Sequence, residues 1–357
     1  IRDIGVTGVQ TCALPIWPLV ELCQGYTGAI GAWDHATNSY SRRITGLPSL
    51  ARKDGREGTG IADLTWHDSI GLVGVFGLGT NPSEITTSGL DPLFGQLVSI
   101  NLQSQQLQPR SNLAAYEATN NPDKADVDSN PYAVQSFSGK LYATDAGGNT
   151  LLTINPASAD SSGNFPIDSH FLFPPVDVTL GPPFVSPPVP FQASPVPTGL
   201  SIDSQANTLK IGQLTGFPFE PGVASVYSLS DQPSASPAKD LTGFTMITDV
   251  AGADDGSLFV LEYTSNFFNP AAQGSIWRVA PHGARTQIIT GLTNPTGLAV
   301  DSHGVLYVSN NADGINGQLL QFSPAPGPLP LHGVWAAWGR SRVLRSRQST
   351  ARRTARP

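Results

Sequence analysis

Charged side chains are scarce in this chain, at 13% of its 357 residues, whereas glycine and proline number 37 and 31. So many turn-forming residues with so few charges are typical of an all-β protein with short strands and argue against a helical one. No window of about 18 uninterrupted apolar residues occurs, so we expect no membrane-spanning helix. The hydrophobic content of 39% is enough for a substantial core.

Several catalytic motifs are also missing. The six histidines occur in neither His-x-His nor His-Glu-x-x-His spacing, which argues against a zinc site. No Gly-x-Ser-x-Gly sequence is present, so a nucleophilic serine at a strand-to-helix turn is not predicted. The run Gly55-Arg-Glu-Gly-Thr-Gly60 lacks a preceding strand and a following Lys-Ser or Lys-Thr, so it fits a flexible loop better than a phosphate-binding loop.

The two ends differ from the body. Residues 1–16 resemble an in-frame translation of a short-read sequencing adapter, and they lack the apolar core of a leader. We therefore exclude them, with Cys12, from the fold. The segment 339–357 carries seven Arg and no acidic residue, as expected for out-of-frame translation; a basic arm for nucleic acid would look similar. Cys23 is then the only cysteine of the body, either disulfide-bonded to a lost partner or a buried free thiol.

The body of the chain is acidic. The full sequence has a net charge of −7. Without the seven C-terminal Arg, Arg2 and Asp3, residues 17–339 hold 12 basic and 26 acidic side chains, a net charge of −14. A charge of this sign opposes polyanions, so nucleic acid and anionic membrane surfaces are not expected partners, whereas cations and neutral ligands remain open.

A strand–turn–strand unit recurs five times in the body. In the last copy, Pro295-Thr-Gly-Leu-Ala-Val-Asp301 is followed by the turn Ser302-His-Gly304 and the strand Val305-Leu-Tyr-Val-Ser309. Such a repeat is typical of a β-propeller, whose blades are four-stranded antiparallel sheets. The second strands of the five units are residues 72–76, 141–145, 209–213, 258–262 and 306–310.

The repeat predicts how the blades divide the chain. Four complete blades and a last one without a fourth strand are assigned to residues 61–114, 132–173, 199–242, 247–290 and 297–322. Two strands, 27–33 and 41–45, precede them and fit the outer strands of a first blade. We therefore predict a six-bladed propeller over residues 17–326, truncated in blade 1 and lacking its N-terminal closing strand, followed by a frameshifted or disordered tail at 327–357.

A set of motifs adds a family resemblance. They are Asp145-Ala-Gly-Gly-Asn149, Ala115-Tyr-Glu117 with Asn120-Asn-Pro-Asp123 and Asp128-Ser-Asn-Pro-Tyr132, Thr215-Gly-Phe-Pro-Phe219, Val260-Leu-Glu262 and Ser309-Asn-Asn311. Over roughly residues 23–322 the chain resembles the ScyD/ScyE family, named after the scytonemin pigment cluster. The resemblance implies an NHL-type or gluconolactonase-like six-bladed propeller that is secreted or periplasmic, its signal peptide lost with the native N-terminus. Gln213 and Met246-Ile-Thr248 depart from the family pattern.

The long loops of this arrangement all fall on one face. They are the loops 77–94, 214–223, 264–274 and 310–317 and the crossovers 115–131 and 174–197 between blades. Because the blades do not need these residues for stability, we predict that this loop-rich face binds ligands. The Pro-rich crossover 174–197 fits a lid or, more simply, a stiff spacer.

The loop-rich face carries polar and aromatic side chains. The predicted binding residues are Glu117, Asn121, Asp123, Asp128, Asn130, Tyr132, Asp145, Asn149, Phe217, Phe219, Glu262, Asn310 and Asn311. Oxygen ligands beside aromatic walls suit Ca²⁺ or another divalent cation, or a planar polar ligand. Asp126-Val-Asp-Ser-Asn130 resembles the start of a calcium loop, but Phe137 stands where the bidentate Glu belongs. The carboxylates could equally accept backbone N–H groups and hold the loop in place, with no metal or cofactor.

Two classes of function remain open. The first is a monomeric binding or assembly module that captures a small molecule, a glycan or a protein on the channel face. The second is a metal-dependent hydrolase or lactonase in which Asp63, Asn130, Asp249 and Glu262 hold a cation in the channel. We favour the binding module, because two blades have only threonine at the equivalent positions.

Overall fold

The computed structural model describes residues 22–34, 39–232, 234–313, 316–323 and 339–344. Strands dominate this part of the chain, and its helices are α1 (Glu84–Thr87), α2 (Leu113–Asn120) and a 3-10 turn at Pro156–Ser158. None of these described helices is long and apolar enough to cross a membrane. The all-β prediction is confirmed. The interpretations of residues 1–16 as adapter, and of most of 327–357 as a tail, lie outside the described residues.

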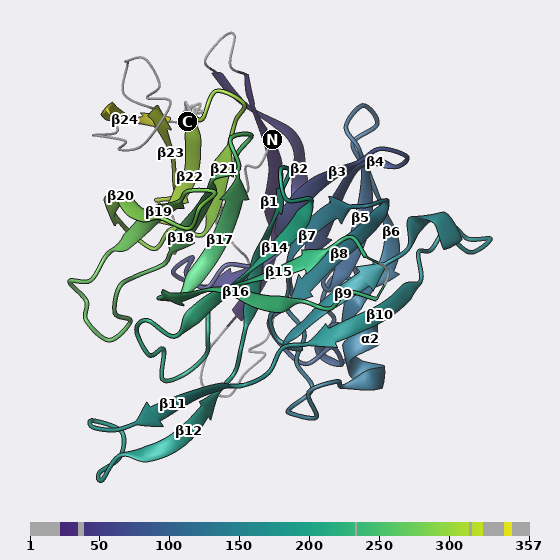
Figure 1. The fold of residues 1–357 in the computed structure, drawn as a ribbon. Coiled ribbons are helices and arrows are strands. Elements are labelled where there is room, and N and C mark those ends of the chain that lie inside the picture. Colours follow the sequence, from purple (N-terminus) through teal and green to yellow (C-terminus); the bar gives the residue numbers. More distant parts are fainter. Residues whose placement is uncertain (1–21, 35–38, 233, 314–315, 324–338, 345–357) are drawn as a thin grey trace, which may run out of the picture.

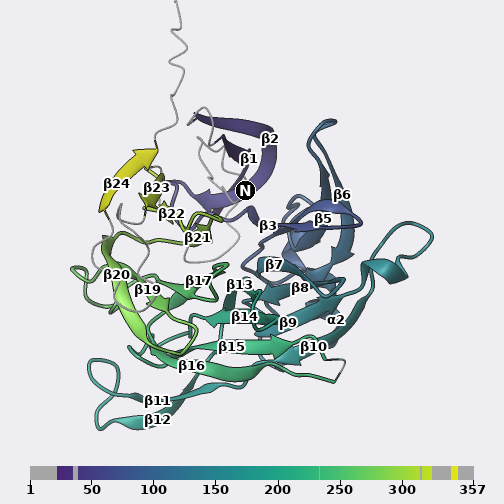
Figure 2. The same cartoon turned by 45° about the horizontal axis from the view of Figure 1, so that its top comes forward.

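Five four-stranded antiparallel sheets form the blades of a propeller (Figures 1 and 2). Their strands, from the inside of each blade outward, are β3–β6 (Ile61–His67, Gly71–Phe76, Gln96–Asn101, Gln106–Asn112), β7–β10 (Pro131–Phe137, Lys140–Asp145, Thr150–Ile154, Ile167–Leu172), β13–β16 (Pro197–Asp203, Thr208–Gln213, Ala224–Ser230, Ala238–Phe244), β17–β20 (Ile247–Gly252, Leu258–Glu262, Gly274–Val279, Arg285–Leu292) and β21–β24 (Gly297–Val300, Leu306–Asn310, Gln318–Ser323, Gly339–Leu344). Each strand pairs with the next one in the sequence, so the predicted meander is confirmed.

The count of six blades is wrong for the described residues, which form five. Where a first blade was expected, β1 (Leu22–Asp34) and β2 (Ser39–Arg52) form a two-stranded sheet of their own. Figure 2 places this sheet between the first and the last blade. Ile30 and Leu47 pack with Ile61 and Phe76 of the first blade. Burial of this apolar surface holds the two long strands against the first blade, although they are not part of a four-stranded sheet.

The last blade has a fourth strand that the sequence pattern did not indicate. β24 pairs with β23, although it comes from the segment expected to be detached from the propeller. An edge strand forms through backbone hydrogen bonds, which need no alternation of apolar and polar side chains. The absence of that alternation was therefore no guide to this strand.

The Pro-rich crossover between the second and third sheets is neither a simple spacer nor irregular. It contains a hairpin of β11 (Val176–Leu180) and β12 (Val189–Ala193), which projects from the ring in Figure 1. The hairpin forms a two-stranded sheet of its own. Its position on the loop-rich face brings two further phenylalanines to the residues discussed below.

The apolar core lies between neighbouring blades. Val73 and Leu97 of the first sheet pack with Val134 and Leu152 of the second. Similar clusters join the second sheet to the third, the third to the fourth and the fourth to the fifth. Alternate residues of each strand point into these layers, which is why the strand pattern was readable from the sequence. Cys23 of β1 is fully buried and disulfide-bonded, not a free thiol, and its partner lies outside the described residues.

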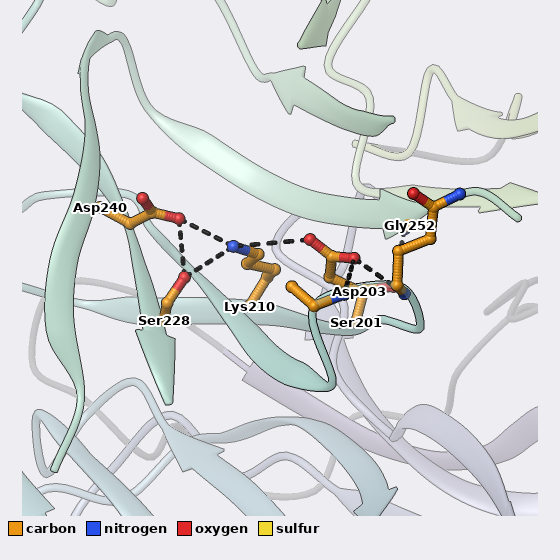
Figure 3. A network of polar contacts seen from close by, with 8 residues as sticks. Ser201, Asp203, Lys210, Ser228, Asp240 and Gly252 are labelled. Carbon is orange, nitrogen blue, oxygen red and sulfur yellow. Dashed lines mark hydrogen bonds and ion pairs between the residues drawn. The ribbon is translucent and has the colours of Figure 1, made fainter. Parts of the chain in front are cut away.

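The third blade also contains a buried cation with its own partners (Figure 3). The ammonium of Lys210 donates to Ser228 Oγ and Asp240 Oδ2, both at 2.8 Å, and lies 3.8 Å from Asp203 Oδ2. These side chains come from all four strands or their ends. The network therefore joins the four strands of this blade to one another.

Candidate functional site

The loops and crossovers predicted to share one face do lie together. The backbone of Thr80, in the β4–β5 loop, pairs with Ser129 of the α2–β7 crossover. The same crossover contacts the β8–β9 turn, where Ala146 N donates to Asn130 O at 3.0 Å. In a propeller the second-to-third-strand loops and the crossovers between blades leave the sheets at the same end, so this association follows from the topology.

Four carboxyl groups meet at the junction of α2, the crossover and the β8–β9 turn. We call this group, together with the amide of Asn121, the acidic junction; its carboxyl groups are those of Glu117, Asp123, Asp128 and Asp145. The last turn of α2 holds Glu117, and Asn121 then ends the helix in the left-handed conformation. Asp145 is the last residue of β8. Sequence reasoning named all five as binding residues but did not include Asp145 among the metal ligands.

Asp145 fixes the crossover to the β8–β9 turn. Its Oδ1 accepts from the backbone N of Asn130 at 2.6 Å and of Gly147 and Gly148 at 3.1 Å, and its Oδ2 accepts from Ser129 Oγ at 2.7 Å. Burial raises the pKa of Asp145 to about 6, although these hydrogen bonds oppose the rise. This carboxyl group accepts backbone N–H groups and holds the loop in place, which was one of the two alternatives left open by the sequence.

Glu117 is different, because it is buried without compensation. Its exposed fraction is 2%, and its Oε1 has no hydrogen-bond partner among the described residues. Burial and the charges of Asp145, Asp123 and Asp128 raise its pKa to about 7. Asp128 shows the same pattern: burial, then the charge of Asp123, raises its pKa, and its Oδ1 is also unpartnered within the described chain.

Two glycines let these carboxyl groups approach the turn. A Cβ on Gly148 would lie 2.5 Å from Glu117 Oε2 and 3.5 Å from Asp145 Cγ. A Cβ on Gly147 would lie 3.0 Å from Asp128 Cγ. The Gly-Gly pair therefore has a packing role, which the sequence motif Asp145-Ala-Gly-Gly-Asn149 did not reveal.

The remaining polar residues of this face hold loops. Asn149 donates to Asp123 Oδ2 at 2.8 Å and accepts from Val196 N, while Asn130 Oδ1 accepts from Leu78 N at 3.2 Å. Asn310 Oδ1 accepts from Thr293 N at 2.8 Å. The side chain of Asn311 donates to Asn316 O at 2.9 Å, which closes the β22–β23 loop.

The four residues proposed for a channel metal are not brought together. Asp63 accepts from Leu64 N and from Val134 N of the next blade, and Asp249 accepts from Val250 N and from Leu298 N of the next blade, all at 2.7–3.0 Å. Glu262 accepts from Thr245 N, Ser275 Oγ and Trp277 Nε1, each at 2.8 Å. In the described part of the chain, no group of three or more His, Cys, Asp or Glu side chains is placed so that it could hold a metal ion, those of the acidic junction included.

Tyr132 is close enough to both inner aspartates, Asp63 and Asp249, for their charges to act on its hydroxyl. Burial raises its pKa, and so do the charges of Asp249 and Asp63. Its hydroxyl donates to Thr296 O, across the ring, at 3.4 Å. The inner residues thus stabilise contacts between blades. Thr144 and Thr198 do the same, because their hydroxyl groups donate to backbone oxygens of the following blades.

An aromatic patch covers another part of the loop-rich face. We define it as Phe184 and Phe191 of the β11–β12 hairpin, Phe217 and Phe219 of the β14–β15 loop, and Phe267 and Phe268 of the β18–β19 loop. Ring centroids of neighbouring members lie 4.3–6.5 Å apart, most of them edge to face. Phe268 remains 52% exposed and Phe217 40%. Sequence reasoning missed Phe184 and Phe191, for which the only signal was aromatic residues within the Pro-rich crossover.

Comparisons with known proteins find no relative by sequence and only distant likeness to solved structures. No protein-family model matches the chain, and no curated protein matches it by sequence. The gluconolactonase XC5397 of Xanthomonas campestris is 14% identical with a TM-score of 0.46, over 90% of this chain and 86% of that one. A putative 6-phosphogluconolactonase from Bacteroides uniformis is 11% identical with a TM-score of 0.47, over 86% and 79%. An inactive virginiamycin B lyase of Staphylococcus aureus, solved with quinupristin, is 14% identical with a TM-score of 0.44, over 84% and 80%. We draw no argument about activity from likeness of this degree.

Proposed function

We propose that this chain is an extracytoplasmic binding module of the ScyD/ScyE type, monomeric, that captures a small aromatic molecule on the aromatic patch. The family and the location rest on the sequence motifs. The ligand class rests on one observation: three insertions from separate repeats converge to expose phenylalanine rings that the blades themselves do not require.

The chemistry of the patch favours an aromatic ligand over a sugar or a protein. Its rings pack edge to face, and a planar ligand can continue that packing with a favourable quadrupole interaction. Phenylalanine has no polar group, whereas recognition of a sugar depends on hydrogen bonds to its hydroxyl groups. An exposed apolar cluster of this kind also marks a binding surface more often than a stable monomer surface.

The alternative, a metal-dependent hydrolase, would need free carboxylate oxygens in the channel. Asp63, Asp249 and Glu262 use theirs to accept hydrogen bonds within and between blades. We therefore assign no catalytic step to these residues.

The test is ligand-detected NMR with indole and, separately, N-acetylglucosamine on the full chain. We expect saturation transfer to indole, which falls at least fivefold in the double variant Phe217→Ala/Phe268→Ala. The matched control is Trp66→Ala, because Trp66 is 65% exposed on the opposite, short-turn face. Undiminished transfer in the double variant, or a preference for the sugar, would contradict the proposal.

A further inference from the structure

The acidic junction contains oxygen atoms for which the described chain supplies no donor. Glu117 Oε1, Asn121 Oδ1 and Asp128 Oδ1 are all inaccessible to solvent and unpartnered. Glu117 is the most informative of them, because its exposed fraction is only 2%. A buried acceptor without a donor is unfavourable, and a buried carboxylate much more so.

The charges at this junction are equally uncompensated. Within the described residues, none of the ion pairs involves Glu117, Asp123, Asp128 or Asp145. Glu117 and Asp145 converge on Gly148, while Asp128 lies against Gly147, so the carboxyl groups surround one short turn. Some positive charge must offset this accumulation when the groups are ionised.

The donor set selects the kind of cation. The unpartnered atoms are two carboxylate oxygens and one amide oxygen, the ligands that a hard divalent cation prefers. A lysine or arginine of a partner protein could not enter, because Glu117 is closed to solvent. Ca²⁺ suits the junction better than Mg²⁺, since Ca²⁺ accepts oxygen ligands in irregular geometry whereas Mg²⁺ needs a nearly ideal octahedron.

We propose that the acidic junction binds one Ca²⁺ through Glu117, Asn121 and Asp128, next to the fixed carboxyl group of Asp145. As the side chains stand, no three carboxylates of the described chain could hold a metal ion, so binding must draw Glu117 and Asp128 toward each other. Asp145 stays in place, because four hydrogen bonds already hold it. The ion would fasten α2 and the crossover to the β8–β9 turn.

The experiment is calorimetric titration of the EDTA-treated full chain with CaCl₂, with thermal melting in parallel. We expect one site with a dissociation constant of about 10⁻⁴ M, as for extracellular calcium modules. At a hundredfold excess over that constant, the melting temperature should rise by roughly 5 °C. KCl at the same ionic strength should not reproduce the rise; an equal rise would overturn the proposal, as would the absence of binding up to 10 mM Ca²⁺.

Variants test the assignment of ligands. Glu117→Gln and Asp128→Asn should each weaken binding at least tenfold, whereas Asp126→Asn, an exposed carboxylate of the same crossover, should change it less than twofold. Without Ca²⁺, Glu117→Gln should melt at or above the wild-type temperature, because a neutral amide removes repulsion. A clearly lower value would show that the carboxylate holds the fold instead. Phe217→Ala/Phe268→Ala should bind Ca²⁺ normally, which separates this proposal from the aromatic one.

Discussion

Replacement of Asp249 by alanine tests whether the inner carboxylates join blades. Asp249 is 5% exposed and lies in β17, the innermost strand of its blade. Its Oδ1 accepts from Val250 N at 2.8 Å, and its Oδ2 accepts from Leu298 N of the adjacent blade at 2.7 Å. Asp249→Ala would leave at least these two backbone donors without their acceptor.

The expected cost follows from those two donors. A buried backbone N–H that loses its partner costs about 1–3 kcal/mol. Two of them, partly relieved by water in the channel, should lower the free energy of unfolding by about 3 kcal/mol. For a chain of this size, that corresponds to a fall in melting temperature of roughly 4–6 °C.

The assay is guanidinium and thermal unfolding of Asp249→Ala beside Asp126→Ala. The control removes an exposed carboxylate for which we expect a change within about 0.5 kcal/mol. If Asp249→Ala melts like the wild type but loses affinity for a divalent cation, then Asp249 is a metal ligand and the assignment of its role between blades fails.

Two further predictions concern the scaffold. Gly199→Ala should lower the melting temperature by several degrees, because the new Cβ would overlap Asp249 Oδ1 and lie 2.6 Å from Asp249 Cα. The comparison is Gly139→Ala, whose Cβ would meet open space, so that this variant reports only the cost of a positive φ. Lys210→Met should cost about 1–2 kcal/mol, since Asp240, its closest partner, is partly exposed. Burial opposes ionisation of Asp240, yet hydrogen bonds from Lys210 and Ser228 lower its pKa overall. A lowered pKa gives stability above the unfolded value of about 3.8 that is lost as the pH falls through the folded value, so the fall in melting temperature between pH 5 and pH 2.5 should be shallower in Lys210→Met. An unchanged acid slope would contradict this role of the pair.

The sequence predicted the strands well, because each blade alternates buried and exposed residues between short turns. The second strand Lys140–Asp145, for example, was assigned as residues 141–145, within one residue of its bounds. The sequence did not predict the number of blades, since pairing between β1 and β2 is as compatible with a separate sheet as with half of a blade. Nor did it predict β24, whose pairing depends on backbone groups and not on a side-chain pattern.

The candidate site was only partly predictable for a related reason. The long loops were correctly assigned to one face, because topology alone determines that. Whether a carboxylate there is free or occupied depends on the register between neighbouring elements. Glu262 and Asp145 both end a second strand, and both accept a backbone N–H from the segment before their own blade, at Thr245 and Asn130. Glu117 has no such partner, a difference that no local sequence pattern encodes.

The two-stranded sheet of β1 and β2 has a consequence for how the ring comes apart. Four junctions between blades share an apolar layer, and side-chain bonds such as Asp63 to Val134 N and Thr198 to Ile247 O cross them. Among the described residues, the ring closes instead past β1 and β2 (Figure 2), where Glu57 N donates to Asp313 Oδ1 in an exposed contact at 3.1 Å. Hydrogen exchange should therefore spread from this seam, while the amides of β13 and β17, on the far side of the ring, exchange last.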